Sequence, residues 1–221
     1  TIIKEGENAV SVAARCLLFN DGRIAGKCPL PETDIEQLKS RGRGARNYSD
    51  FRVNDWRVLL EPVRNVTTLY CFGAGHVAQP TARIAAMAGF RVVVMDDRAE
   101  WADTERFPEA HEVKVIEDYR SVFKEYEFGD EDYIVIVTRG HQYDHVVLEE
   151  ALKTGAGYIG MIASRRKRDA VFQLLRARGV KGEELQRVCS PIGLDIGAET
   201  PEEIAVSVVA ELIKKRSGQA K

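Results

Sequence analysis

Residues 66–97 read VTTLYCFGAGHVAQPTARIAAMAGFRVVVMDD, and this stretch decides the fold. It opens with a short apolar run, 66–71, of the kind that forms a buried strand. An apolar, small-residue helix is predicted over about 77–88 and a second strand over 91–95. Because an acidic pair ends the second strand, the stretch has the order of the dinucleotide-binding fingerprint: strand, turn, helix, strand, acid. It therefore predicts a Rossmann βαβ unit.

The turn between the first strand and the helix has the pattern G-x-G-x-x-A. The residues expected to bind a cofactor here are Gly73, Ala74, Gly75, His76, Val77 and Ala78. The first glycine permits the tight turn, the second lets a phosphate approach the backbone, and the alanine lets helix and strand pack closely. The helix N-terminus adds free N–H groups and a partial positive charge. Asp96 follows Gly75 at about the spacing of 20 residues expected for an acid that binds a ribose hydroxyl.

The composition is that of an ordinary soluble globular protein, with 44% hydrophobic and 30% charged residues and a net charge of −2. No basic patch or acidic tail dominates, so we expect no nucleic-acid partner and no membrane surface. No apolar run approaches the length of about 18 residues that a membrane-spanning helix needs. The N-terminal residues lack the apolar core of a secretion signal. The four cysteines form no C-x-x-C pair, which favours a reducing, cytoplasmic setting.

The first 64 residues differ from the rest. Their predicted elements are short: strands over 9–19 and 56–63, a hairpin turn at 20–22, and a helix over 32–40. This part holds little apolar sequence, so we expect residues 1–64 to form a small β-rich cap. Residues 65–221 are expected to form the main, Rossmann domain.

From residue 66 onward apolar strands alternate with helices. Further strands are predicted over 112–116, 133–137, 158–161 and from 188, and further helices over 120–127, 145–154, 165–178 and 201–216. Near-continuous apolar strands separated by helices indicate a parallel sheet that is covered on both faces. The predicted fold class is α/β, a Rossmann-like doubly wound parallel sheet with a small N-terminal β-rich cap.

Ligands of such sheets bind beyond the carboxyl ends of the strands. The polar residues predicted at this edge, besides the glycine turn, are Asp96, Asp97, Arg98, Thr138, Arg139, Gly140, His141, Ser164, Arg165 and Arg166. A purely structural sheet has no need to gather titratable groups at one edge. Alternatives stay open: His76 as a solvated first-turn residue, Asp96 as a cap, and Arg98 in a surface ion pair. The basic run at Lys167 and Arg168 is interpreted as a solvated helix face.

Metal and nucleophile chemistry have weaker support. The spacing of His141, Asp144 and His145 is compatible with a metal, but no cysteine or glutamate stands at matching spacing. The sequence has no G-x-S-x-G nucleophile elbow and no Walker loop. A dehydrogenase would also need a substrate domain after the Rossmann unit, and only one predicted helix follows Leu194.

Five separated motifs stand in order along the chain: Phe72–Ala78, Val94–Arg98, Thr138–His141 with Asp144, Tyr158–Lys167, and Pro191–Ala198 with Thr200–Ala205. Together, over about residues 57–216, they resemble the XdhC/CoxI family of xanthine dehydrogenase accessory proteins. The resemblance implies that the glycine-turn and edge residues line a cofactor or nucleotide site.

The resemblance further implies an accessory factor that binds the molybdenum cofactor, molybdopterin, and aids its sulfuration and its insertion into molybdenum hydroxylases. It implies two partners, the molybdenum hydroxylase apo-enzyme and a cysteine desulfurase. A cofactor-binding chaperone is then favoured over a dehydrogenase. Two alternatives stay open, an NAD(P)-dependent oxidoreductase with an NAD-like dinucleotide and a dinucleotide-sensing regulatory module. A homodimer is open as well.

The N-terminal segment departs from the family pattern. The family carries a glycine-rich stretch with a cysteine there, whereas residues 17–28, LLFNDGRIAGKC, keep only the hairpin and a following cysteine. By this resemblance Cys28 is a candidate sulfur ligand of molybdenum, with a structural cysteine as the alternative.

Overall fold

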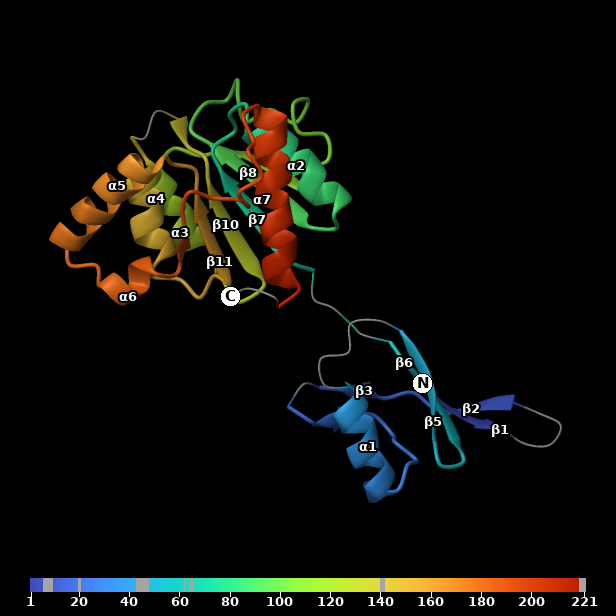
Figure 1. Cartoon of the computed structure of the whole chain (residues 1–221). Coiled ribbons are helices and arrows are strands. Elements are labelled where there is room, and N and C mark those ends of the chain that lie inside the picture. The colour runs from blue at the N-terminus through green and yellow to red at the C-terminus, as the bar shows by residue number, and fades with distance from the viewer. Residues whose placement is uncertain are drawn as a thin grey trace. The chain divides into compact units, whose positions relative to one another are not determined.

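The computed structural model describes residues 1–5, 10–19, 21–42, 48–61, 63, 66–139 and 142–218. The chain divides into two compact units, Thr1–Arg64 and Asn65–Lys221 (Figure 1). Within the described residues, no helix is both long enough and apolar enough to cross a membrane.

The N-terminal unit is built mainly from antiparallel strands. Its elements are β1 (Ile2–Glu5), β2 (Val10–Ala14), β3 (Leu17–Leu18), β4 (Ile24–Ala25), α1 (Glu32–Gly42), β5 (Ser49–Val53) and β6 (Trp56–Leu60). Four strands form a sheet in the order β2-β1-β6-β5, and β3 pairs with β4 as a separate hairpin. The small core gathers Ile2, Leu30, Leu38, Val53 and Val58. The predicted β-rich character of this segment is confirmed.

Two details of the N-terminal prediction are wrong. The single strand expected over 9–19 is two strands, because β2 pairs with β1 whereas β3 pairs with β4 in another sheet. The strand expected over 56–63 ends at Leu60. The hairpin turn expected at 20–22 falls between β3 and β4, although Asn20 itself lies outside the described residues.

The second unit is a parallel sheet with interleaved helices. Its elements are β7 (Thr68–Phe72), α2 (Ala78–Met87), β8 (Arg91–Asp96), β9 (Glu112–Val115), α3 (Tyr119–Glu125), β10 (Asp132–Ile136), α4 (Asp144–Ala151), β11 (Tyr158–Met161), α5 (Arg165–Ala177), α6 (Gly182–Leu185), β12 (Val188–Cys189) and α7 (Pro201–Arg216). The strand order is β12-β11-β10-β7-β8-β9, and every neighbouring pair is parallel. This is the doubly wound Rossmann order, so the predicted fold class is confirmed.

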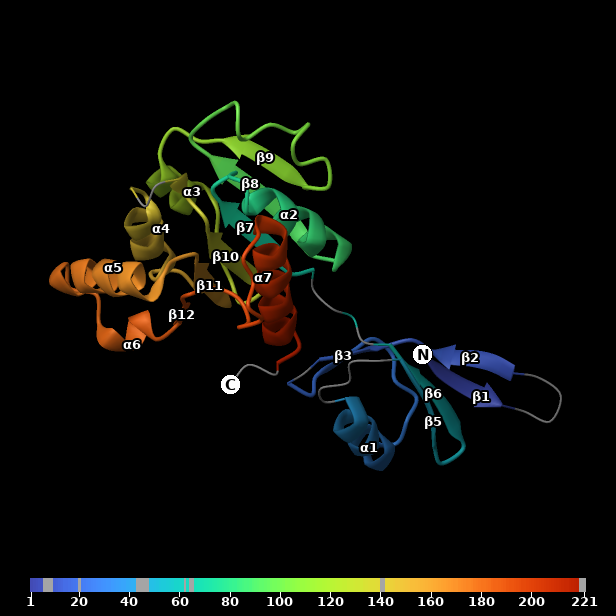
Figure 2. The same cartoon turned by 45° about the horizontal axis from the view of Figure 1, so that its top comes forward.

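The sheet separates two apolar cores. Successive side chains of a strand point to opposite faces, so Leu69 and Cys71 of β7 pack with α2 and α7, whereas Tyr70 and Phe72 pack with α3, α4 and α5. Figures 1 and 2 show these two groups of helices on opposite sides of the sheet. The strands are apolar nearly throughout because both faces are covered.

The chain order of the strands reverses between β7 and β10. The connections leave β7 toward β8 on one side, and the chain returns to β10 on the other side. The loops that follow these two strands therefore diverge, and in doubly wound sheets they border the ligand crevice. The glycine turn follows β7, and the segment that begins at Thr138 follows β10.

Candidate functional site

The two glycines of the turn after β7 have different roles. Gly73 has a φ of 113°, and its N–H donates to the Met95 carbonyl of β8 at 2.7 Å. A Cβ added at Gly73 would lie 2.3 Å from the carbonyl oxygen of Val137, which follows β10. A Cβ added at Gly75 would meet no described atom within 4 Å. Gly73 thus fits a crowded turn, whereas Gly75 borders open space.

The start of α2 offers backbone donors. Its N-cap residue, Val77, makes no side-chain capping hydrogen bond, whereas Ser164 and Thr200 cap α5 and α7 with their hydroxyls. Among the described residues, the N–H groups of Gly75, His76 and Val77 have no hydrogen-bond acceptor. Uncapped N–H groups at a helix start bind anions such as phosphate.

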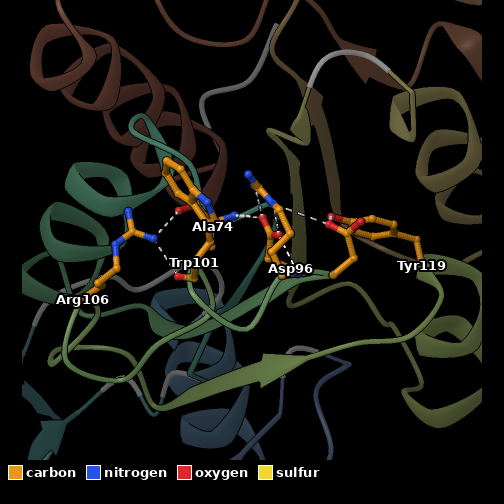
Figure 3. Close-up of polar contacts among 7 residues, drawn as sticks. Ala74, Asp96, Trp101, Arg106 and Tyr119 are labelled. Carbon is orange, nitrogen blue, oxygen red and sulfur yellow. Dashed lines mark hydrogen bonds and ion pairs between the residues drawn. The ribbon is translucent and has the colours of Figure 1, made fainter.

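Asp96 fixes the glycine turn through a hydrogen bond. Its side chain is fully buried and accepts hydrogen bonds from the Ala74 N–H at 2.7 Å and from Arg98 Nε and Nη2 at 2.8 and 2.9 Å. The Arg98 N–H adds a fourth bond at 3.1 Å. Figure 3 shows the Asp96 carboxylate next to Ala74 of the turn. Asp96 therefore lies at the expected edge but points into the protein, and its contact with a ribose stays a prediction.

Asp97, the second acid, lies closer to solvent. A fifth of its side chain is exposed, and its carboxylate accepts a hydrogen bond from Tyr119 Oη at 3.4 Å. Burial and the two nearby carboxylates raise the pKa of Tyr119, so its hydroxyl stays protonated as a donor. Asp97 is the more accessible carboxylate at the end of β8.

The hydrogen bonds to Asp96 make stability depend on pH. Burial alone would raise the pKa of Asp96, but the bonds from Arg98 and Ala74 hold it below its ordinary value. A carboxyl group whose pKa is lowered by folding stabilises the fold at pH values above its ordinary pKa. This contribution is lost as pH falls through the folded-state pKa.

We therefore predict that Asp96→Asn is about 2 kcal/mol less stable than the wild type at pH 7, because a buried charge-assisted network loses its anion. The difference should shrink as pH falls below about 4. Chemical denaturation at a series of pH values measures both. Asp195→Asn, at an exposed carboxylate, is the control. A difference between wild type and Asp96→Asn that does not change with pH would contradict this account.

An aromatic and cationic cluster covers the same turn. The guanidiniums of Arg98 and Arg106 each lie 4.6 Å from the ring centroid of Trp101, and the His76 ring meets Trp101 edge-on at 5.3 Å. Arg106 Nη1 donates to the carbonyls of Ala74 at 3.1 Å and Trp101 at 2.7 Å (Figure 3). Both backbone groups of Ala74 are thus held, the N–H by Asp96 at the end of β8 and the carbonyl by Arg106 from the segment between β8 and β9.

A buried ion pair lies beyond β10 and β11. Asp144, the first residue of α4, is fully buried, accepts a hydrogen bond from Thr138 Oγ1 at 2.5 Å, and pairs with the ammonium of Lys167. Lys167 Nζ also approaches the carbonyl of Ile162 at 3.4 Å. The interpretation of Lys167 as part of a solvated face is wrong, because α5 starts beside β11 and its first turn carries the side chain inward.

The other predicted edge residues differ in their surroundings. Arg139, Arg165 and Arg166 are exposed, and Ser164 caps α5. Ala78 is buried at the first turn of α2 against β7, in line with its expected packing role. Gly140 and His141 lie outside the described residues.

The metal candidates do not form a cluster. Within the described ranges, no group of three or more histidine, cysteine, aspartate or glutamate side chains could hold a metal ion. His145 is half-buried on α4, and its proposed partner His141 is outside the described residues. Cys28 is half-buried and packs against the core of the N-terminal unit.

The two thiols of the Rossmann unit are poor nucleophiles. Burial raises the pKa of Cys71 to about 12, and burial together with the Glu211 carboxylate raises the pKa of Cys189 to about 11. Both therefore stay protonated near neutral pH. Cys71 is a buried core residue of β7.

Comparison with known proteins assigns the chain to a family. A protein-family model described as the XdhC Rossmann domain matches residues 69–212. The chain belongs to the XdhC family. The matched XdhC region contains the glycine turn, Asp96, Thr138 and the buried Asp144–Lys167 pair, whereas Cys28 lies outside it.

Two curated proteins are similar to this XdhC-family chain. The uncharacterized protein YqeB of Escherichia coli strain K12 is 30% identical over 93% of the chain and 41% of its own length. A probable xanthine dehydrogenase subunit of Bacillus subtilis strain 168 is 37% identical over 72% of the chain and 46% of its own length. The chain spans less than half the length of either relative.

A solved structure has the same fold. It is described as the crystal structure of a xanthine dehydrogenase from Bacillus halodurans, and it superposes with a TM-score of 0.73 at 25% sequence identity. The superposition covers 99% of the present chain and 62% of the other chain. The aligned part of the present chain therefore includes residues of both units described above.

Proposed function

We propose that this chain binds the molybdenum cofactor at the carboxyl edge of its parallel sheet and assists its sulfuration and its insertion into a hydroxylase of the xanthine dehydrogenase type. One observation carries the proposal: the uncapped start of α2, with three N–H groups lacking acceptors among the described residues, lies beside open space at Gly75. A phosphate group matches both features, since it needs donors and close approach to the backbone.

The residues present fit the phosphate end of such a cofactor. The N–H groups of Gly75, His76 and Val77 would hold the phosphate, and the exposed His76 ring beside them offers aromatic surface to a planar heterocycle. The turn is already held in place by Asp96 and Arg106, so little rearrangement is needed on binding. When bound, the cofactor supplies the molybdenum centre at which sulfuration takes place.

The Rossmann unit has no thiolate that could bind the molybdenum of the cofactor. Its cysteines, Cys71 and Cys189, are held protonated by burial, and a protonated thiol is a poor metal ligand. This favours a role in holding and presenting the cofactor, with sulfur delivered by a partner. We therefore propose a cysteine desulfurase and the apo-hydroxylase as partners, and the name of the Bacillus subtilis relative accords with the second of them.

A second candidate is an NAD-like dinucleotide. The doubly wound strand order and the G-x-G-x-x-A turn favour it, since both are typical of dinucleotide sites. In that case Asp97 is the carboxylate available to a ribose, because Asp96 is already occupied by Ala74 and Arg98. This ligand would suit either an oxidoreductase or a sensing module.

Gly75→Ala tests the site with little effect on the fold. The added methyl group meets open space, so we expect a melting temperature close to that of the wild type. The same methyl would lie where a phosphate approaches, so binding should weaken at least about tenfold, or about 1.4 kcal/mol. Mass spectrometry of small molecules released from the purified proteins, followed by titration with released pterin and with NADH, measures this loss and identifies the ligand class.

Gly129→Ala is the matched control. It adds the same methyl group near the start of β10, at the opposite edge of the sheet, where the nearest described atom is 3.9 Å away. It should retain wild-type binding. Recovery of NADH alone, with measurable hydride transfer, would support the second candidate. Equal ligand binding by Gly75→Ala and wild type would refute a phosphate site at this turn.

A further inference from the structure

A groove lies outside the carboxyl-edge site, between α5 on one side and α6 with β12 on the other. Its cavity is about 330 Å³ and is open to solvent. The residues that line it are Arg168, Phe172, Arg176, Gly182, Leu185, Gln186, Val188 and Ser190. None of them belongs to the cofactor site described above, so the groove calls for a separate explanation.

One wall is a ridge of three side chains along α5. Arg168, Phe172 and Arg176 are four residues apart in turn, which places them on the same face of the helix at intervals of about 6 Å. The ridge therefore presents cation, aromatic ring and cation in a row. The facing wall supplies the apolar side chains of Leu185 and Val188.

The two arginines differ in how they are held. Arg168 donates from Nη1 to the Ser190 carbonyl at 3.2 Å and pairs with Asp169, so it is fixed at one end of the groove. Among the described residues, no hydrogen bond or ion pair engages the Arg176 guanidinium. No carboxylate lines the cavity within the described part of the chain. An acid at one end of an occupant would meet the Arg176 guanidinium, and an acid at the other end would share the Arg168 guanidinium with Asp169 through its remaining Nη hydrogens.

The charge of the surrounding segment also favours an acidic partner. Residues 164–187 contain eight lysines and arginines but three acids, in a chain whose net charge is −2. The local excess of positive charge is therefore opposite in sign to the chain as a whole. Charge patches of this kind select and steer partners of opposite charge.

Two features favour an extended peptide as the occupant. β12 is the edge strand of the sheet, and within the described residues its outer side pairs with no strand. The buried hydroxyl of Ser190, directly after β12, has no hydrogen-bond partner in the described structure. An added extended segment supplies backbone donors and acceptors to such an edge.

The spacing of the ridge residues sets the spacing of the side chains expected in the peptide. Alternate residues of an extended chain point to the same side at intervals of about 6.6 Å, close to the interval of about 6 Å between successive ridge residues. We propose that this groove binds an extended segment of a partner protein with the pattern acid-x-apolar-x-acid. The two acids meet Arg168 and Arg176, and the apolar residue packs on Phe172. This docking surface is independent of the proposed cofactor function.

The test titrates the ¹⁵N-labelled full chain with the peptide acetyl-Gly-Glu-Ser-Leu-Ser-Glu-Gly-amide and follows backbone and arginine Nε–H signals by NMR. We expect saturable shifts at Arg176, Leu185 and Ser190. Arg176→Gln should weaken binding by about tenfold, the loss typical of one desolvated charge pair. Arg178→Gln removes the same charge from the same helix, but Arg178 pairs with Glu149 outside the groove, so it should change affinity less than about twofold.

A charge reversal tests the contact between Arg176 and the peptide directly. Arg176→Glu should lose the acidic peptide and gain a peptide whose matching terminal acid is replaced by lysine, which a general loss of structure would not produce. The proposal is overturned if an isomer with adjacent acids, Glu-Glu-Ser-Ser-Leu, binds equally well. It is also overturned if the two glutamine variants weaken binding equally, or if inorganic phosphate alone gives the same shifts.

Discussion

Gly73→Ala is expected to lose about 4 kcal/mol of folding stability, because the alanine would combine an unfavourable backbone conformation with a steric overlap. Gly73 has a φ of 113°, where residues with a Cβ are strained. The added carbon would also lie 2.3 Å from the Val137 carbonyl oxygen and 2.6 Å from its carbon. Both are backbone atoms, so a side-chain rotation cannot relieve the overlap.

The position of Gly73 explains the size of this effect. Its N–H bonds to β8 through Met95, and its Cα faces the backbone that leaves β10. Three adjacent strands therefore approach one another at this residue. Moving Val137 to make room would pull on the central strand of the sheet, whose neighbours Ile136 and Val135 are fully buried.

Thermal and urea denaturation measure the loss. For a chain of this length, about 4 kcal/mol corresponds to a drop in melting temperature of about 8 to 16 °C. Gly75→Ala, two residues away in the same turn, is the control and should melt close to the wild type. If the two variants have equal stability, the close approach of the turn to β10 is not present in solution.

The sequence predicts the fold well where its signal is local and continuous. The stretch over 66–97 contains its own strand, turn, helix and strand, and the structure has β7, α2 and β8 there with shifts of one or two residues at their ends. Later strands such as 133–137 and 158–161 are short apolar runs between helices, which suffices to place β10 and β11. Strands buried on both faces must be apolar, so this pattern is reliable.

The N-terminal unit is harder to predict because its strands are half exposed. β5 reads SDFRV, with few apolar residues, and owes its structure to pairing with β6. β1 likewise pairs with β2 and with β6, which lies far away in the sequence. In the Rossmann unit, α6 spans only one turn and is stabilised by burial of Leu185. None of these elements has a periodic pattern long enough to identify it.

In the site too, residues that a local motif joins are predicted, whereas residues that meet through distant contacts are missed. The glycine turn and Asp96 are found because a motif joins them. Trp101 and Arg106 are missed because their contacts with Ala74 depend on how the segment after β8 folds back. The sequence WADTER after Asp97 contains an aromatic residue and an arginine in the loop that follows a predicted ligand-binding strand. That signal is weak alone, but it could have marked the loop.

Lys167→Met is expected to destabilise the fold by about 3 to 5 kcal/mol, because it leaves the buried Asp144 carboxylate without the ammonium that balances its charge. Asp144 is fully buried, and 13% of the Lys167 side chain is exposed, so water replaces little of the lost interaction. The Thr138 hydroxyl still donates to Asp144, but a neutral donor compensates for only part of the charge.

A matched control separates this pair from surface ion pairs. Lys153→Met removes an equal charge from the pair with Glu150, which lies at 2.9 Å, but 61% of the Lys153 side chain is exposed. Its loss should cost less than about 1 kcal/mol. Urea denaturation of the wild type and both variants gives the comparison, and equal stability of the two variants would show that the Asp144–Lys167 pair is not buried in solution.

The double variant Asp144→Asn/Lys167→Met distinguishes the loss of the ion pair from lost packing. Asparagine keeps an acceptor for the Thr138 hydroxyl and removes the negative charge, so the double variant should recover about half of the stability lost in Lys167→Met. Recovery would show that part of the loss in Lys167→Met comes from burying a carboxylate without its ammonium. The pair also joins the start of α5 to Asp144 at the start of α4, which in turn accepts the hydrogen bond of Thr138 beyond β10. We expect the double variant to fold but to bind the proposed cofactor more weakly than Lys153→Met does, because Thr138 lies at the proposed binding edge.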